Sequence, residues 1–239
     1  MRLIRHLALA AAALTIALPA AADGEAPPKP SHGAGVGLHA YVAIDLDVLA
    51  AVQTFQAVLG TSHLPAYGGG VDVTDLWKHF FARVAATHMH KRGSRVFVDG
   101  SQVFKLGIPL TVSMTPVEVG GGWRFVQKPR PPVRGRPRPP SRVRVTPYAG
   151  ASALLVSFKQ TSQFADASEN PSSTFKGGSV FGGAEFVAYK TLLVGGEAQY
   201  RFVPNALSRG GVSDVSAAYD EKDLGGFTVR VTIGIRLGR

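Results

Sequence analysis

The sequence contains no cysteine, so disulfide bonds are excluded from this chain of 239 residues. A lipid anchor on cysteine is excluded for the same reason. After the N-terminal region, no apolar run reaches the roughly 18 residues that a membrane-spanning helix needs, which argues against a helical membrane protein. We therefore expect the fold to be stabilised by the pairing of its own strands.

The N-terminal region has the features of a secretory signal peptide. A basic start is followed by an apolar run over residues 7–18 and by small residues at 20–22. We expect residues 1–22 to be this signal peptide, which leaves 217 of the 239 residues for one barrel-sized domain. Residues 23–34 are rich in proline and are predicted to be a flexible periplasmic lead.

The formal net charge of +10 would ordinarily suggest nucleic-acid binding. Two of these charges lie in residues 1–22 and seven lie between residues 128 and 144, in a stretch without any acid. The rest of the chain therefore carries a net charge of only +1, and we exclude nucleic acid as a partner.

The Pro/Arg-rich insert at residues 128–142, KPRPPVRGRPRPPSR, is too rich in proline for a strand or a helix. It is either a solvated, variable loop or a contact for anionic lipid headgroups or a cell-envelope polymer, because arginine pairs well with phosphate. The candidate contact residues are Arg130, Arg134, Arg136 and Arg138. Strand parity places this insert on the periplasmic side.

The last stretch of the chain alternates strictly between apolar and polar or small residues. One face carries Phe227, Val229, Val231, Ile233, Ile235 and Leu237. A period of two predicts a β-strand with two unlike faces. Seven further stretches read as strands, and the predicted set covers residues 36–48, 67–76, 79–98, 103–125, 145–159, 175–189, 192–203 and 227–237.

The connections between these strands fit one architecture. Asp99-Gly100 is a strong hairpin signal, whereas Pro109 and Pro116 predict bulges or a break. We interpret residues 49–59 as a loop, with a short helix as the alternative. An even count and the alternation of long and short connections predict an all-β fold, an eight-stranded antiparallel transmembrane up-and-down β-barrel over residues 35–239.

The face opposite the apolar band carries six acids and five arginines, a near balance. An eight-stranded barrel is filled by its own side chains, so these charges predict an ion-paired plug with little conductance. The expected network consists of Asp72, Arg83, Glu118, Arg124, Glu185, Glu197, Arg201 and Arg230. Asp45, Asp47 and Arg236 lie on the same face, and an ion path through these groups is the weaker interpretation.

No pattern predicts a metal, a cofactor or catalysis. His88 and His90 share one strand face but lack a third ligand, and histidines near lipid headgroups are the better interpretation. Serine, histidine and aspartate occur without a motif that would place a nucleophile beside a base, so we do not expect an enzyme. The glycine pairs and triplets lie within predicted strands and lack the lysine and helix of a phosphate loop.

The predicted strands TPYAGASALLV (146–156), SVFGGAEF (179–186) and VGGEAQYRF (194–202), together with the signal peptide and the final amphipathic strand, resemble the small bacterial outer-membrane β-barrels of the OmpA and OmpX type, the opacity-like porins. The resemblance implies a location in the cell outer membrane and partners in outer-membrane lipid and the outer-membrane assembly machinery. Such barrels commonly end on an aromatic residue, a place that Leu237 takes in this chain.

Two alternatives remain open at this point. A small porin would pass ions or small solutes through the same barrel. A soluble periplasmic barrel of the lipocalin type would bind an apolar ligand, with the apolar face turned inward and the charges outward. The aromatic residues at the strand ends favour the membrane, because such residues form girdles at its two interfaces.

Overall fold

The structure is a computed structural model, and it describes residues 36–100, 102–126, 145–162, 170, 172–207 and 213–237. The predicted signal peptide, the periplasmic lead and the Pro/Arg-rich insert, residues 128–142, lie outside the described residues. The compact unit that contains the described residues spans Ala34–Arg239.

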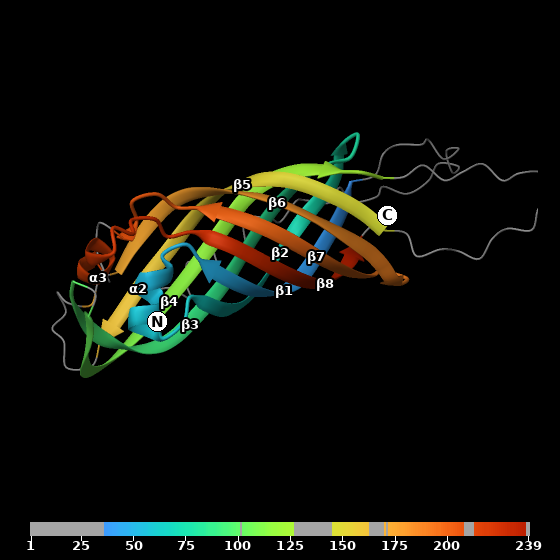
Figure 1. Cartoon of the computed structure of the whole chain (residues 1–239). Helices are drawn as coiled ribbons and strands as arrows, with labels where there is room; N and C mark the ends of the chain where they lie inside the picture. The colour runs from blue at the N-terminus through green and yellow to red at the C-terminus, as the bar shows by residue number, and fades with distance from the viewer. Residues whose placement is uncertain are drawn as a thin grey trace, which may run out of the picture. The chain divides into compact units, whose positions relative to one another are not determined.

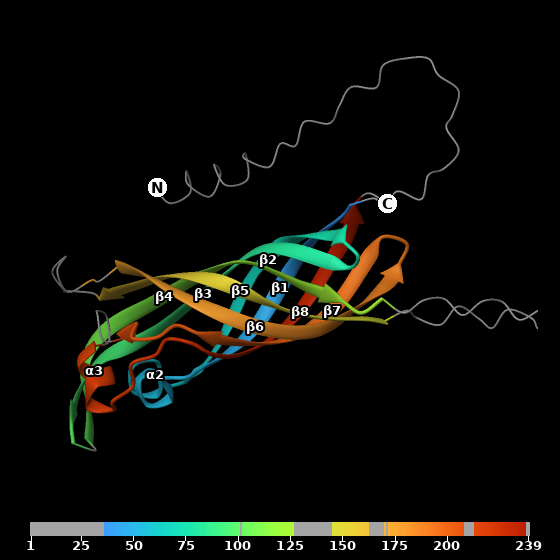
Figure 2. The ribbon, with the colours of Figure 1, turned by 90° about the horizontal axis from the view of Figure 1, so that it is seen from above.

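Eight strands form one closed, antiparallel up-and-down barrel, in which each strand pairs with its sequence neighbour and β8 closes onto β1. Figures 1 and 2 show the tilted strands and the closed wall. The strands are β1 Gly37–Leu49, β2 His63–Trp77, β3 Phe80–Asp99, β4 Gln102–Arg124, β5 Val145–Ser162, β6 Ser172–Tyr189, β7 Leu192–Phe202 and β8 Gly226–Leu237. The fold class predicted from the sequence, an eight-stranded barrel, is confirmed.

The two ends of the barrel differ in their connections. One end, which we call the termini end, holds the start of β1, the end of β8 and the tight turns at residues 78–79 and 190–191. The other, which we call the helix end, holds the connections that contain helices α2 (Val52–Leu59) and α3 (Ser213–Ala218). β4 ends and β5 begins at the termini end, as strand parity predicts for the segment between them.

The two faces of the wall exchange character along each long strand. On β4, Glu118 is buried inside the barrel while Val119 is 56% exposed outside it. Four residues closer to the helix end, the buried residue is Met114, and its neighbour Thr115 on the outer face is polar. β5 shows the same change, because its inward residue Ser152 is polar and the next inward residue toward the helix end, Leu154, is apolar. The wall is therefore polar inside over most of its length and apolar inside at the helix end.

The apolar inner face at the helix end forms the main hydrophobic core together with α2 and the β7–β8 connection. Phe55 of α2 is completely buried, and Val58 and Leu59 are buried beside it. The β7–β8 connection contributes Val203 and Leu224. α2 and α3 thus pack on the inner wall at this end, as Figure 2 shows.

The interpretation of residues 49–59 as a loop is wrong, because residues 52–59 form α2. The helix is short, and its apolar residues at 55, 58 and 59 follow the helical spacing over only two turns. A helix of this length depends on tertiary contacts. Those contacts come from the barrel wall and from Glu221, whose carboxylate accepts hydrogen bonds from the backbone N–H of Gln53 (3.0 Å) and Thr54 (2.8 Å).

The β3–β4 hairpin extends beyond the neighbouring strands at the helix end (Figure 2). These extended strands take the place of a long loop, so the connection between them is short. The strand register shifts between Ser94 and Val96, opposite Pro109, where Gly107 has a positive φ of 70°. The irregularity predicted at Pro109 is therefore present. Pro116 causes no shift, since it continues the β4–β5 register opposite Val156.

No helix of the described residues is long and apolar enough to cross a membrane, a finding that concerns helices alone.

Replacement of Glu221 by alanine should loosen α2, because it removes an anionic acceptor from the first turn of the helix. We expect a local cost of about 1 kcal/mol, seen as several-fold faster hydrogen exchange at the amides of Gln53 and Thr54. Lys222→Ala is the matched control, since the Lys222 side chain is 58% exposed and pairs only with the exposed Asp220 among the described residues. Equal exchange in the two variants would contradict the capping role.

Candidate functional site

Arg230 of β8 lies at the centre of the charged interior and is completely buried. Its guanidinium donates two hydrogen bonds to Asp45, from Nε to Oδ1 and from Nη2 to Oδ2, both at 2.9 Å. It also contacts Glu118 at 3.1 Å and Glu197 at 3.2 Å. Asp45 and Glu197 are the direct register partners of Arg230 on β1 and β7, so strand pairing on the two sides of β8 brings these three residues together.

Arg83 of β3 forms a second centre on the side toward the termini end. It makes a bidentate pair with its register partner Asp72, at 2.9 and 3.0 Å, and reaches Glu197 on the far wall. Four aromatic rings surround the guanidinium, with the Phe181 centroid at 4.6 Å and the others at 5.5 Å. The other three rings belong to Tyr41, Phe81 and Tyr148. Such faces stabilise a cation that has lost its water.

Two glycines make room for this aromatic cage. A side chain at Gly70 would come within 2.6 Å of the Tyr41 hydroxyl, and one at Gly183 would come within 2.7 Å of the Tyr148 hydroxyl. These two glycines within the strands therefore serve close packing rather than a phosphate loop.

Arg201 of β7 connects the charged layer to the helix end. It contacts Asp47 at 2.7 Å, and Asp45 and Glu118 at 3.2 Å each. Asp47 also accepts a hydrogen bond from the Thr228 hydroxyl. One continuous cluster thus joins Arg83, Arg201 and Arg230 to five carboxylates, namely Asp45, Asp47, Asp72, Glu118 and Glu197.

A separate pair lies nearer the termini end, where Arg124 contacts Glu185. His39 lies beside it, with Nδ1 at 3.1 Å from Arg124 Nη1. Arg236 donates to His39 Nε2 at 3.3 Å, but its own side chain is exposed rather than part of the buried layer. The structure thus brings six of the eight predicted network residues into the main cluster and places the other two in this pair.

The sequence does not identify Asp45 and Asp47 as partners of the arginines, although its alternation places both on the inner face. Their partners lie on β7 and β8, and the register that joins β1 to β8 leaves no local sequence signal. With Arg236 at the rim, six carboxylates face four arginines among the described interior residues, so the charges are less balanced than the expected six against five.

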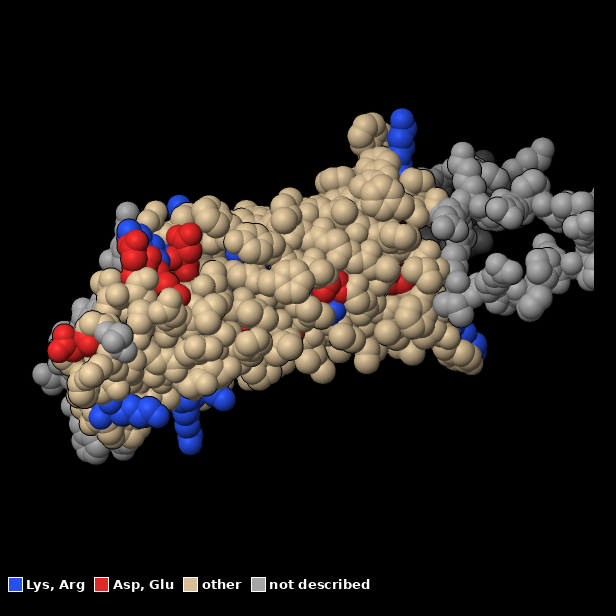
Figure 3. Space-filling view, viewed as in Figure 1, with Lys and Arg blue, Asp and Glu red and all other residues tan. Residues whose placement is uncertain are grey.

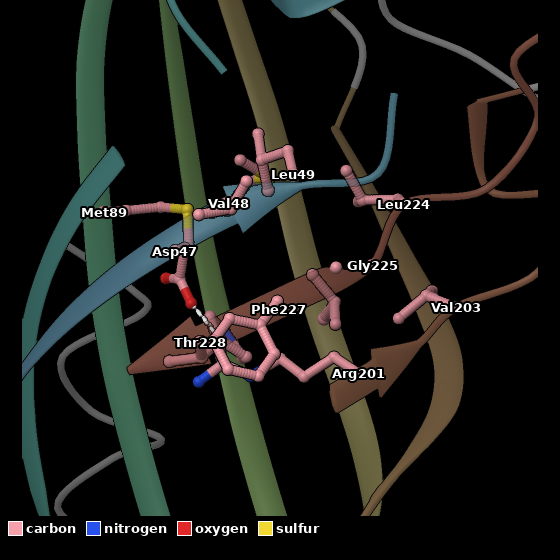
Figure 4. Close-up of a pocket in the computed structure, with 14 residues that line it drawn as sticks. Asp47, Val48, Leu49, Met89, Arg201, Val203, Leu224, Gly225, Phe227 and Thr228 are labelled. Carbon is pink, nitrogen blue, oxygen red and sulfur yellow. Dashed lines mark hydrogen bonds and ion pairs between the residues drawn. The ribbon is translucent and has the colours of Figure 1, made fainter. Parts of the chain in front are cut away.

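The cavities between these side chains are small. One of about 30 Å³ lies where the charged layer meets the apolar core, between Asp47, Arg201 and Met89. Figure 4 shows Asp47 turned toward Thr228, with Leu49 and Met89 on the other side. A second cavity of about 20 Å³ lies beside Arg83. Spaces of this size hold one or two water molecules.

His88 and His90 face outward, where they contact hydroxyl groups of β4. His88 Nδ1 lies 2.9 Å from Thr115 Oγ1, and His90 Nδ1 lies 3.1 Å from Ser113 Oγ. Within the described part of the chain, no group of three or more histidines and acids could hold a metal ion. The pair therefore belongs to the outer surface of the wall.

Arg230→Leu should strongly destabilise the barrel, because it leaves Asp45, Glu118 and Glu197 buried without their shared cation. Breaking a buried ion pair in this way costs about 3–5 kcal/mol. Urea unfolding of the refolded protein in detergent micelles would measure the loss, with Arg236→Leu as the exposed control. A cost below about 1 kcal/mol for Arg230→Leu would contradict a structural role of the cluster.

Comparison with known proteins adds no close relative. No protein-family model matches the sequence, and no curated protein matches it either. Structural similarity extends to the attachment invasion locus protein Ail of Yersinia pestis, with 9% identity, coverage of 84% of this chain and 99% of that one, and a TM-score of 0.47. Neisserial surface protein A is similar over 84% and 96% of the two chains, with 10% identity and a TM-score of 0.45.

The N-terminal β-barrel domain of Pseudomonas aeruginosa OprF is similar over 83% of this chain and 97% of that one, with 7% identity and a TM-score of 0.38. The resemblance that the sequence suggests, to small outer-membrane β-barrels, agrees with these matches. We infer the function from the closed strand order and from the direction of the side chains in this chain.

Proposed function

We propose that this protein is an outer-membrane β-barrel with a structural or surface-interaction role, and that its interior is closed to steady ion flow. The observation that carries the proposal is the direction of the side chains. An apolar band faces outward around the barrel, while the buried interior at the same level holds arginines and carboxylates. A wall of this kind suits a lipid solvent, which satisfies the apolar face and leaves polar groups to pair inside.

The height of the outward band supports this proposal. On β8 it runs from Phe227 to Leu237, and each outward side chain is 43–53% exposed. Ten residue steps of about 3.3 Å, tilted by about 40°, give a height of about 25 Å. The apolar band of known outer-membrane barrels is about 25 Å tall.

Exposed aromatic residues border the band at both ends. Those near the termini end are Trp77, Phe80, Phe125 and Tyr189, and those nearer the helix end are Tyr67, Tyr200, Phe202 and Phe227. Two such rings are typical of the two membrane interfaces. Figure 3 shows that the surface in view between the ends carries few charged side chains.

The lipocalin alternative requires the inner and outer faces of the wall to be exchanged. A soluble barrel with an apolar ligand would turn its apolar side chains inward and its charges outward. Here Val231 and Ile233 are 53% and 52% exposed, whereas their neighbour Arg230 is completely buried. We therefore favour the membrane barrel, with the termini end on the periplasmic side and the helix end outside the cell.

Two layers support the closed interior. The charged cluster spans the barrel from β1 and β8 to β4, and the apolar core with α2 and α3 covers the helix end. We propose a role without catalysis, with outer-membrane lipid as the partner of the band. Contacts with the assembly machinery, and with anionic polymers through the Pro/Arg-rich insert, stay predictions.

Ile233→Arg should cost roughly 2–4 kcal/mol if the centre of the band lies at the bilayer midplane. Folding titrations into lipid vesicles would measure this cost. Thr232→Val is the matched control on the inner face of the same strand, where a nearly isosteric change should be far milder. The same cost for both variants would mean that the outer face does not meet lipid.

Single-channel recording in planar bilayers tests the closed interior. We expect no large, steady openings from the inserted protein, because side chains of the described residues occupy the barrel and the two cavities found between them are small. Insertion is checked separately by protection of the band from protease. Regular openings of constant size would favour the alternative of a small porin that passes ions or small solutes.

A further inference from the structure

The outer surface of β3, β4, β5 and β6 becomes polar where these strands pass beyond the apolar band. We call this surface the outer polar strip and define it by the outward side chains of residues 88–92, 111–115, 157–161 and 174–176. These segments contain no aspartate or glutamate. They carry the cations Arg92, Lys159 and Lys176, all exposed, among threonine, serine and histidine side chains.

The register holds these groups close together. Lys159 lies opposite Ser113 on β4, and Arg92 lies opposite Thr111, the next outward residue of the same strand. Arg92 and Lys159 are therefore two strands apart, about 10 Å across the sheet. Their long side chains can reach one group between them, above the hydroxyls of Thr111 and Ser113.

Hydrogen bonds fix part of the strip in place. Ser113 and Thr115 each contact a histidine of β3, at 3.1 Å and 2.9 Å. Cations beside hydroxyl donors, without any acid, suit a group with several anionic oxygens. Arginine and lysine are the common protein partners of a phosphate, and here Arg92 and Lys159 lie on the two sides of the space above the hydroxyls.

The surface directly below the strip is apolar. Leu155 precedes the strip on β5 and is 48% exposed, and Val119 on β4 is 56% exposed. A ligand that spans both surfaces needs a phosphate group joined to hydrocarbon chains. This combination fits a membrane lipid and does not fit a free anion, which would gain nothing from the apolar part.

The opposite side of the helix end has the opposite charge. The β7–β8 connection there carries Asp220, Glu221 and Asp223. The hydrogen bond from Lys222 lowers the pKa of the Asp220 carboxyl and so keeps it ionised. In Figure 3 acidic side chains gather at the upper left of the view, with some basic ones among them, whereas Lys and Arg lie along the lower left edge. A lipid phosphate is therefore attracted to one side of the barrel only.

We propose that the outer polar strip binds the phosphate of a lipid headgroup in the outer leaflet, with the lipid chains lying on the apolar band below. The site rests on the proposed membrane location, and it lies at the end of the barrel opposite the one where β4 ends and β5 begins. It makes this wall of the barrel selective for phosphate-bearing lipids.

The test compares the full-length protein with an Arg92→Gln/Lys159→Gln variant in vesicles of phosphatidylcholine that contain a minor fraction of phosphatidic acid. Lipids that remain bound after gentle detergent extraction are counted by native mass spectrometry. We expect several-fold enrichment of phosphatidic acid on the wild-type protein and the loss of most of that enrichment in the variant, since each basic residue near an anionic surface adds to the attraction of an anionic lipid. The enrichment should fall with added salt.

Lys105→Gln/Lys222→Gln is the matched control, because it removes the same charge from the same end of the barrel outside the strip. Equal losses in the two variants would show an effect of net charge and overturn the site. Displacement of the lipid by millimolar inorganic phosphate would identify a free-anion site instead. Failure of the wild type to insert into vesicles would contradict the proposed function, whereas insertion without enrichment would contradict this inference alone.

Discussion

The exchange of faces along the strands is the constraint on which the rest of the structure depends. The direction of the side chains alternates without interruption from Leu110 to Glu118 of β4, so Glu118 and Met114 both point inward. Only the identity of the residues changes, from charged to apolar inside and from apolar to polar outside. Such a pattern satisfies a wall that meets lipid along one part of its length and water along the other.

The buried charges follow from this constraint. Where the outer face is apolar, the polar face of each strand has to lie inside a narrow closed barrel, and every charge there needs a partner. Closure of β8 onto β1 places Arg230 between Asp45 and Glu197, which are direct neighbours in the register. The cluster therefore couples strands that lie far apart in the sequence, and its geometry depends on the correct register of all eight.

The sequence predicts the features that depend on period two. It identifies the eight strands, the two faces of β8 and the inner position of every acid and arginine of the main cluster. It does not predict which acid meets which arginine, because Asp45 and Arg230 are joined only by closure of the barrel. It also misses α2, whose stability depends on the wall and on Glu221, 167 residues beyond Thr54. Arg236 follows the inward alternation, yet it lies so near the strand end that its side chain reaches solvent.

The apolar core at the helix end and the outer polar strip lie on the inner and outer faces of the same strand extensions. A sheet that continues beyond the membrane has water on its outer face, so its apolar residues have to turn inward and be covered there. α2, α3 and the β7–β8 connection provide that cover, with Phe55 completely buried against the wall. Because the inner face is covered, β3 to β6 can extend past the border of exposed aromatic residues and hold Arg92 and Lys159 at the level that we propose for the lipid headgroups. The proposed closed interior and the proposed selective outer surface thus have one structural cause.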